Sequence, residues 1–218
     1  MAALGELLFY ISTQNEHKDF KPPESPSKET RSASGWQVSN ALISLVSSVL
    51  RKGEDDLTQL YALRTIENIC SQGAYWATRF TSQDLISNLC YIYRATGKQE
   101  SMRQTAGSCL VRLARFNPPC IQTVVEKLSL KEIASSFVKG SAREQQGRDD
   151  FRITLLQVLE CIAEDAPLVT QNAEIIIREI LPSLAGIYNG NKDGDARFLC
   201  LKIWFDSMTI LLTECTEI

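Results

Sequence analysis

Residues 61–70, with the sequence YALRTIENIC, decide the fold of this chain. Their apolar side chains Ala62, Ile66, Ile69 and Cys70 are spaced i, i+4, i+7 and i+8, which places them on one face of an α-helix. A helix with a single apolar face must bury that face against a neighbouring element. The architecture therefore depends on what the rest of the chain supplies as neighbours.

Related stretches recur along the chain: TAGSCLVRLA at 105–114, TLLQVLECIA at 154–163 and, more loosely, LCLKIWFDSM at 199–208. Matching Ile66, Leu110, Leu159 and Ile203 gives steps of 44, 49 and 44 residues. Such a period on helical elements is typical of armadillo or HEAT repeats. No stretch alternates with a period of two. We predict an all-α, right-handed armadillo/HEAT-like α-solenoid of about four to five helical repeats, forming one segment over residues 1–218.

The composition is ordinary for a folded protein and has no overall basic character. Of 218 residues, 44% are hydrophobic and 22% are charged, with a net charge of −3. Sequence-independent nucleic-acid binding needs many Lys and Arg side chains to neutralise phosphates, so no nucleic-acid partner is expected. No apolar run approaches the roughly 18 residues that would suggest a membrane-spanning helix, so no membrane partner is expected either.

Catalytic and metal-binding motifs are missing from the sequence. Its seven cysteines form no CxxC pair, and His17 is the only histidine. We interpret the cysteines as reduced core thiols and expect no metal site, no cofactor and no catalytic residue. No phosphate-binding glycine motif occurs. An enzyme, or a regulatory subunit of one, remains the hypothesis from a different class.

Residues 15–35, NEHKDFKPPESPSKETRSASG, differ in composition from the rest. They are polar and rich in Pro and Ser, so we expect a flexible loop that buries too little apolar surface to fold. Within it, Ser25 begins a Ser-Pro-x-Lys pattern favoured by proline-directed kinases. Ser25 is our candidate phosphosite, and the alternative is an ordinary surface loop.

The last helix of each repeat is expected to line an inner groove, at 57–71, 99–116, 149–164 and 196–213. Asn68 lies in a unit that matches the armadillo asparagine that grips a peptide backbone, but the corresponding positions hold Arg112 and Cys161. The asparagine ladder is therefore not repeated. Since three arginines lie on the helix at 99–116, we also expect a basic patch there, with Lys98 nearby. The candidate partner-binding residues are Arg64, Asn68, Arg103, Arg112 and Arg115.

Both ends of the chain suggest further contacts. The first helix is expected at 2–14, with Leu4, Leu7, Leu8 and Ile11 on its apolar face. A chain that enters a helix at once fits a segment excised from a longer protein. The last helix has an unusually broad apolar face. Since terminal repeats need polar caps, this face favours a homodimer through the exposed terminal repeat. That face contains Phe198, Leu201, Phe205, Met208 and Leu212.

The wording of three segments resembles a known family: LGELLFYISTQ at 4–14, ALRTIENICSQGAYWATRFTSQDLISNLCYIYRATGKQES at 62–101, and RQTAGSCLVRLARFNPPCIQ at 103–122. They are similar to the armadillo-repeat region of RUNKEL-like proteins, plant relatives of the Fused/Unc-51-like kinases. That family has an N-terminal kinase-like domain followed by helical repeats, and it is associated with microtubules and the phragmoplast. No kinase motif occurs here, so no catalytic residue is implied.

The resemblance implies a non-catalytic scaffold that binds microtubules or microtubule regulators in plant cytokinesis, in the cytoplasm at the cytoskeleton and phragmoplast. The alternative is a general protein or peptide adaptor, for example for a kinesin-like motor, without direct microtubule contact.

Overall fold

The computed structural model describes residues 1–16, 39–131 and 145–214, and in these ranges the chain is helical with no strand. The predicted all-α solenoid is confirmed. The elements are α1 (Ala2–Glu16), α2 (Asn40–Ser48), α3 (Asp56–Cys70), α4 (Ala74–Phe80), α5 (Gln83–Arg94), α6 (Glu100–Phe116), α7 (Cys120–Lys127), α9 (Gln145–Ala163), α10 (Ala166–Gln171), α11 (Ala173–Ile175), the π-helix η1 (Ile176–Ile180), α12 (Leu181–Gly190) and α13 (Gly194–Glu214).

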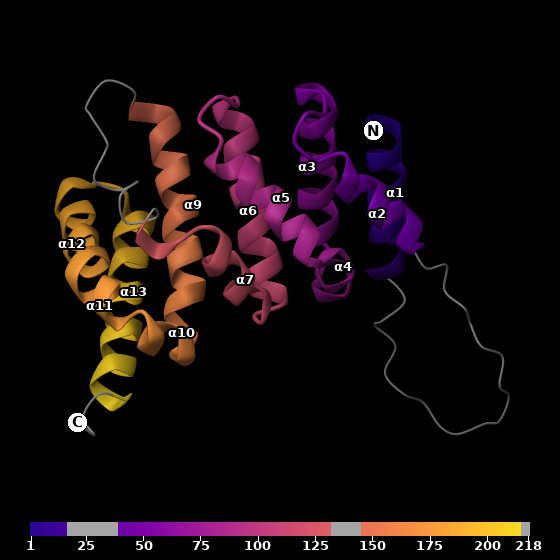
Figure 1. Cartoon of the computed structure of the whole chain (residues 1–218). Coiled ribbons are helices and arrows are strands. Elements are labelled where there is room, and N and C mark those ends of the chain that lie inside the picture. Colours follow the sequence, from indigo (N-terminus) through magenta and orange to yellow (C-terminus); the bar gives the residue numbers. More distant parts are fainter. Residues whose placement is uncertain (17–38, 132–144, 215–218) are drawn as a thin grey trace, which may run out of the picture.

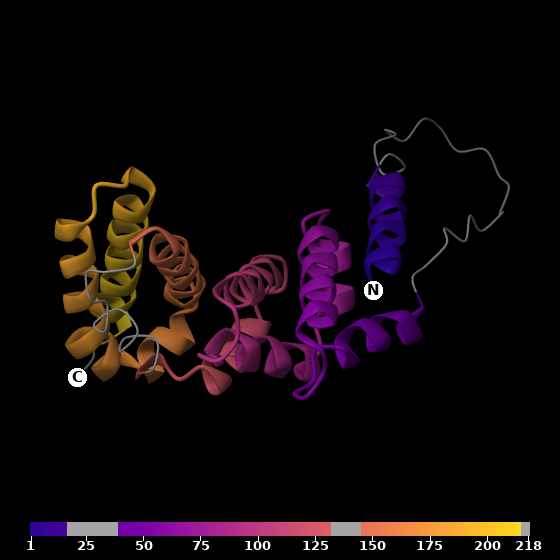
Figure 2. The ribbon, with the colours of Figure 1, turned by 90° about the horizontal axis from the view of Figure 1, so that it is seen from above.

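The helices form two layers in a shallow arc. The long helices α1, α3, α6, α9 and α13 lie side by side and run in the same direction (Figure 1). Seen from above, they follow the inner side of the arc, whereas α2, α5, α7 and α10 follow the outer side (Figure 2). Each long helix packs on the next one, so the layer is built from contacts between neighbours. We call it the long-helix layer.

The repeated apolar positions of the sequence form the core between these layers. Ile66, Leu110, Leu159 and Ile203 are all buried, with no more than 2% of each residue exposed. They therefore occupy equivalent places in α3, α6, α9 and α13, as the 44- and 49-residue steps predict. The first helix differs from its prediction, because Leu8 is buried whereas Leu7 is 54% exposed.

Local sequence signals explain where the helices begin and end. Asp55 caps α3 by accepting hydrogen bonds from the Thr58 backbone N–H and hydroxyl, both at 2.9 Å, and these bonds lower the pKa of its carboxyl. At α5, the N-cap is Ser82, which accepts from the Leu85 N–H at 3.2 Å. The neighbouring Thr81 would also suit an N-cap, but it ends α4 instead.

Pro182 interrupts the helical stretch after α10, as its missing N–H predicts. The chain passes through the π-helix Ile176–Ile180 before α12 begins at Leu181. The π-helix has wider turns than an α-helix, and it ends two residues before Pro182. The departure from α-helical geometry is therefore confined to the residues next to the proline.

Two glycines allow long helices to approach closely. A Cβ atom on Gly5 would collide with the Thr65 hydroxyl of α3, and one on Gly107 would collide with Thr154 of α9 and Tyr93 of α5. Gly5 therefore sets the distance between α1 and α3, and Gly107 sets the distance between α6 and its neighbours.

The predicted loop at 15–35 is described only in part. Asn15 and Glu16 belong to α1, which extends two residues beyond its expected end. The rest of the predicted loop lies outside the described residues, and so does Ser25.

Candidate interaction surface

Charged and polar side chains connect neighbouring long helices. Between α3 and α6, the Ser108 hydroxyl donates to Glu67 Oε1 at 2.6 Å, and Arg112 Nη2 lies 3.7 Å from the same oxygen. Between α6 and α9, Arg115 Nη2 lies 3.0 Å from Glu160 Oε2. Two of the candidate arginines are therefore paired with glutamates of adjacent repeats.

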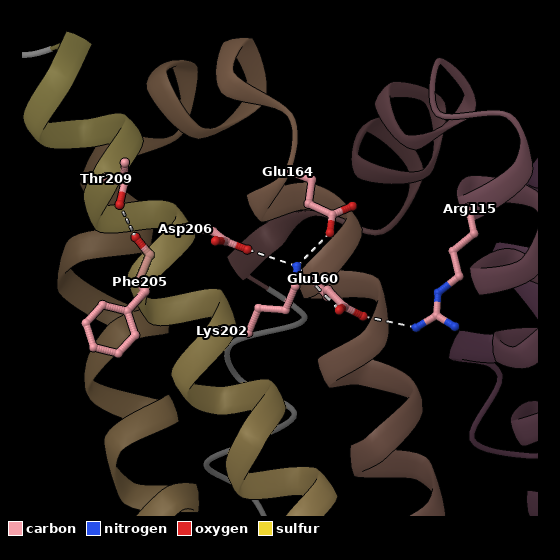
Figure 3. A network of polar contacts seen from close by, with 7 residues as sticks. All are labelled: Arg115, Glu160, Glu164, Lys202, Phe205, Asp206 and Thr209. Carbon is pink, nitrogen blue, oxygen red and sulfur yellow. Dashed lines mark hydrogen bonds and ion pairs between the residues drawn. The ribbon is translucent and has the colours of Figure 1, made fainter.

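Lys202 of α13 extends these contacts to the end of the layer (Figure 3). Its Nζ lies 2.6 Å from Glu164 Oε1, 3.0 Å from Asp206 Oδ2 and 3.5 Å from Glu160 Oε1. Burial alone would lower the pKa of Lys202, but the hydrogen bonds and charges of Glu164 and Asp206 outweigh burial and raise it. These contacts form two separate clusters, which we together call the charge ladder. One joins α3 and α6 through Glu67, Ser108 and Arg112. The other joins α6, α9 and α13 and contains Arg115, Glu160, Glu164, Lys202 and Asp206.

The expected basic patch on α6 is not continuous. Arg103 and Arg112 are nine residues apart, which is two and a half helical turns, so they lie on opposite sides of α6. Arg103 Nε donates to the Tyr93 carbonyl oxygen of α5 at 3.0 Å. Lys98 is engaged with Asp56 and donates to Gln59 Oε1 at 2.8 Å. The structure thus pairs Arg112 with Glu67 and Arg115 with Glu160, and it places Arg103 elsewhere.

The other two candidates, Arg64 and Asn68, lie together in a groove between α1 and α3. Both are exposed, and within the described residues no ion pair or hydrogen bond engages either side chain. They are four residues apart, so they project from the same face of α3. We call this the α1–α3 groove; its volume is about 330 Å³, and it is lined by Ala2, Gly5, Glu6, Phe9, Tyr61, Arg64, Thr65 and Asn68.

The chemistry of the α1–α3 groove suits an extended peptide. Arg64 offers a guanidinium with free donors, and the Asn68 amide can both donate to and accept from a peptide backbone. Phe9 and Tyr61 are 37% and 38% exposed, and they provide aromatic walls. Glu6 adds one carboxylate on the α1 side.

Sequence reasoning identified the polar half of this groove and missed the aromatic half. Phe9 lies outside the apolar face predicted for the first helix, so it carried no signal for burial. A large aromatic residue off the buried face is itself a usable signal, because exposed aromatic side chains are enriched in binding sites.

The described cysteines do not contribute reactive groups. Cys70, Cys90, Cys109, Cys120, Cys161 and Cys200 are free and buried. Burial raises the pKa of Cys70 and Cys90 to about 12, and that of Cys120, Cys161 and Cys200 to about 11. These thiols are therefore protonated at neutral pH and are weak nucleophiles.

The described ranges contain no group of three or more His, Cys, Asp or Glu side chains arranged to hold a metal ion. None of the described helices is long and apolar enough to cross a membrane.

Comparison with known proteins relates the chain to kinase-associated repeats. The chain is 52% identical to serine/threonine-protein kinase RUNKEL of Arabidopsis thaliana, in an alignment that covers all of this chain and 29% of RUNKEL. It is 30% identical to serine/threonine-protein kinase ULK4 of Mus musculus over 146 residues, covering 67% of this chain and 10% of ULK4. The chain thus spans less than a third of either relative, and the resemblance to RUNKEL-like proteins is confirmed.

A solved structure supports the fold alone. The crystal structure of an engineered protein matches with a TM-score of 0.62 at 12% identity, covering 77% of this chain and 63% of that one.

Residues 106–218, just over half of the chain, match the model of the HEAT repeats of ULK4-like serine/threonine-protein kinases. This family is a repeat region and not a catalytic kinase domain. The chain therefore belongs to the HEAT-repeat family of ULK4-like serine/threonine-protein kinases.

Proposed function

We propose that this chain is a non-catalytic protein-binding scaffold that holds microtubules, or proteins that regulate microtubules, during plant cytokinesis. In this proposal it acts in the cytoplasm, at the cytoskeleton and the phragmoplast. Its similarity to RUNKEL supports a repeat scaffold within a kinase-like protein, and HEAT repeats generally mediate protein interactions.

The observation that carries the proposal is that Arg64 and Asn68, in the α1–α3 groove, form no side-chain hydrogen bond or ion pair with any residue that the structure describes. Every other candidate arginine already has a partner within the fold. An incoming acidic peptide therefore meets free donors in this groove, without first having to break an ion pair. Acidic segments on the surface of tubulin have the required chemistry.

Microtubule co-sedimentation tests direct binding. The wild-type chain should pellet with microtubules at low salt, and added salt should weaken the association. Replacing Arg64 by Ala and Asn68 by Ala together should leave more protein in the supernatant. Arg178→Ala is the matched control, because Arg178 is exposed and lies in η1, away from the groove.

One outcome would reject direct binding: a wild-type chain that stays in the supernatant even at low salt. The neutralised charge ladder favours the alternative in that case, since Arg112 and Arg115 are not free to attract an acidic polymer. The chain would then act as an adaptor, for example for a kinesin-like motor. A pull-down of a purified motor by wild-type chain, but not by the Arg64→Ala/Asn68→Ala variant, would support that role.

A further inference from the structure

A pocket opens between α6 and α9, at an internal junction of the long-helix layer. Its volume is about 310 Å³, and it is lined by Ala114, Arg115, Pro118, Ile121, Cys161, Glu164 and Asp165. The two helices that form its walls each have a further neighbour, because α3 packs on α6 and α13 packs on α9 (Figure 1). The pocket is thus enclosed by helices of this chain on both sides. We call it the α6–α9 pocket.

The floor of the α6–α9 pocket is apolar. Ala114, Ile121 and Cys161 are buried, with 4%, 2% and 9% of each residue exposed. Burial raises the pKa of the Cys161 thiol to about 11, so this group adds no charge at neutral pH. The exposed Pro118 continues the apolar surface outwards. The floor can therefore hold an aliphatic chain, because covering it removes apolar surface from water.

Two adjacent residues place carboxylates at the rim of the α6–α9 pocket. Glu164 Oε1 accepts a hydrogen bond from Lys202 at 2.6 Å. Asp165 Oδ1 accepts one from the Leu168 N–H at 3.0 Å, as the N-cap of α10. The second oxygen of each carboxylate forms no hydrogen bond or ion pair with any residue that the structure describes. Figure 3 shows this for Glu164, where a dashed line joins only one oxygen to Lys202.

The charged groups beside the pocket leave an excess of negative charge. They are two cations and four carboxylates: Arg115, Lys202, Glu160, Glu164, Asp165 and Asp206. Both cations are already paired, Arg115 with Glu160 and Lys202 with three carboxylates around it. A cation is therefore attracted to this pocket, whereas an anion meets no unpaired positive charge among these groups.

The ends of two helices add to this field. α6 ends at Phe116 and α9 ends at Ala163, and both helices run in the same direction (Figure 1). Residues of both last turns line the pocket, among them Arg115 and Cys161. The carboxyl end of an α-helix carries roughly half a negative elementary charge. Two such ends beside one pocket favour a positively charged ligand.

We propose that the α6–α9 pocket binds an arginine side chain of a partner protein. The methylene groups of the arginine lie on the apolar floor, and its guanidinium donates to the second oxygens of Glu164 and Asp165. A charged head on an aliphatic stem suits a site with an apolar floor and an acidic rim. A guanidinium suits it better than an ammonium does, because its donors form a rigid fork that can reach two carboxylates together. The α1–α3 groove takes the opposite charge, so the two sites are independent.

NMR titration of the 218-residue chain tests the proposal, with the methyl signals of Ala114 and Ile121 as reporters. The probe peptide acetyl-Gly-Arg-Gly-amide should shift both signals saturably at low salt, and added salt should weaken its binding. Acetyl-Gly-Glu-Gly-amide should leave them in place, and acetyl-Gly-Lys-Gly-amide should bind several-fold more weakly than the arginine probe. The absence of a saturable shift with the arginine probe would overturn the proposal. A lysine probe that binds as tightly would overturn the assignment to arginine.

Variants at the rim test the electrostatic part of the proposal. Glu164→Gln/Asp165→Asn keeps the shape of both side chains, and Asn also suits the N-cap of α10. This variant should weaken binding of the arginine probe by roughly tenfold, because both charge-assisted contacts are lost. Arg115→Gln should instead strengthen binding, because it removes a nearby positive charge. Unchanged affinity in the first variant, or weaker binding in the second, would reject the acidic rim as the binding determinant.

Asp195→Asn is the matched control for the loss of a carboxylate. Asp195 is exposed at the amino end of α13, whereas the pocket lies at the carboxyl ends of α6 and α9. Asp195→Asn should bind the arginine probe as wild type does. Arg64→Ala/Asn68→Ala should do the same, because these residues line the α1–α3 groove. A loss in either variant equal to that of Glu164→Gln/Asp165→Asn would contradict the assignment to the α6–α9 pocket.

Discussion

The first and last junctions of the long-helix layer are built in different ways. α1 meets α3 at close range over Gly5, and the polar residues beside that contact, Arg64 and Asn68, pair with no side chain in the described part of the chain. α9 meets α13 through the charge ladder, in which Lys202 is surrounded by carboxylates. The same kind of repeat can therefore use its polar side chains in contacts within the fold, or leave them available to a partner.

The largest expected effect comes from core truncation, and it tests whether the two ends are equally coupled to the array. Ile203→Ala in α13 should reduce the free energy of unfolding by about 2–5 kcal/mol, because it leaves a cavity beneath a helix that packs on several neighbours. Leu8→Ala should reduce it less in urea denaturation, because α1 packs chiefly on α3 and can detach alone. Equal losses for the two variants would show that α1 is as strongly coupled as α13.

A second test addresses the close contact at the first junction. Gly5→Ala should cost about 1–3 kcal/mol, because its methyl group collides with the Thr65 hydroxyl. Thr65→Ala should restore much of this loss in a double-mutant cycle. Gly186→Ala is the matched control: no atom lies near its added Cβ, so this helical substitution should instead stabilise the chain by about 0.5–1 kcal/mol. A Gly5→Ala variant as stable as wild type would remove the steric argument.

The charge ladder predicts a pH-dependent difference at the last junction. Because the folded-state pKa of Lys202 is raised, its contribution to stability is complete below its ordinary pKa of 10.5 and is lost as the pH rises above that value. Lys202→Met should therefore be less stable than wild type by about 1 kcal/mol at neutral pH. The difference in stability between wild type and Lys202→Met should narrow in alkaline solution, as measured by thermal unfolding of both proteins at each pH. A gap that stays constant up to strongly alkaline pH would contradict the role of the lysine charge.

The smallest effect is expected where an ion pair belongs to neither junction. Arg178 and Glu174 are 3.3 Å apart, and both side chains are 76% exposed. Arg178→Ala should change the free energy of unfolding by less than about 0.5 kcal/mol in the same denaturation assay, because water screens the pair. A larger loss would mean that exposed pairs contribute as much as the charge ladder does.

Much of the fold could be predicted from the sequence, because the apolar period of residues 61–70 reports directly on burial. Ile66, Leu110, Leu159 and Ile203 are buried as that period requires. The split at Pro182 was also predictable, since it follows from a missing backbone donor. The position of the cap at α5 was not, because Thr81 and Ser82 are adjacent and both suit the role.

The candidate surface was less predictable, because pairing between repeats depends on distances that no local pattern encodes. Nothing in the sequence near Arg115 indicates that Glu160, 45 residues later, will reach it at 3.0 Å. The position of Arg103, in contrast, was predictable: nine residues separate it from Arg112, and the helix period makes that two and a half turns. Asn68 was selected from the motif and Arg64 from its place on the same predicted groove helix, and the structure adds the aromatic walls beside them.

The shared direction of the five long helices has an electrostatic consequence. Each α-helix carries roughly half a positive elementary charge at its amino end and roughly half a negative one at its carboxyl end. Since α1, α3, α6, α9 and α13 are aligned, their amino ends collect along one rim of the arc and their carboxyl ends along the other. The array is therefore polarised across its width, and a charged partner lying along the arc experiences a field that distinguishes its two rims.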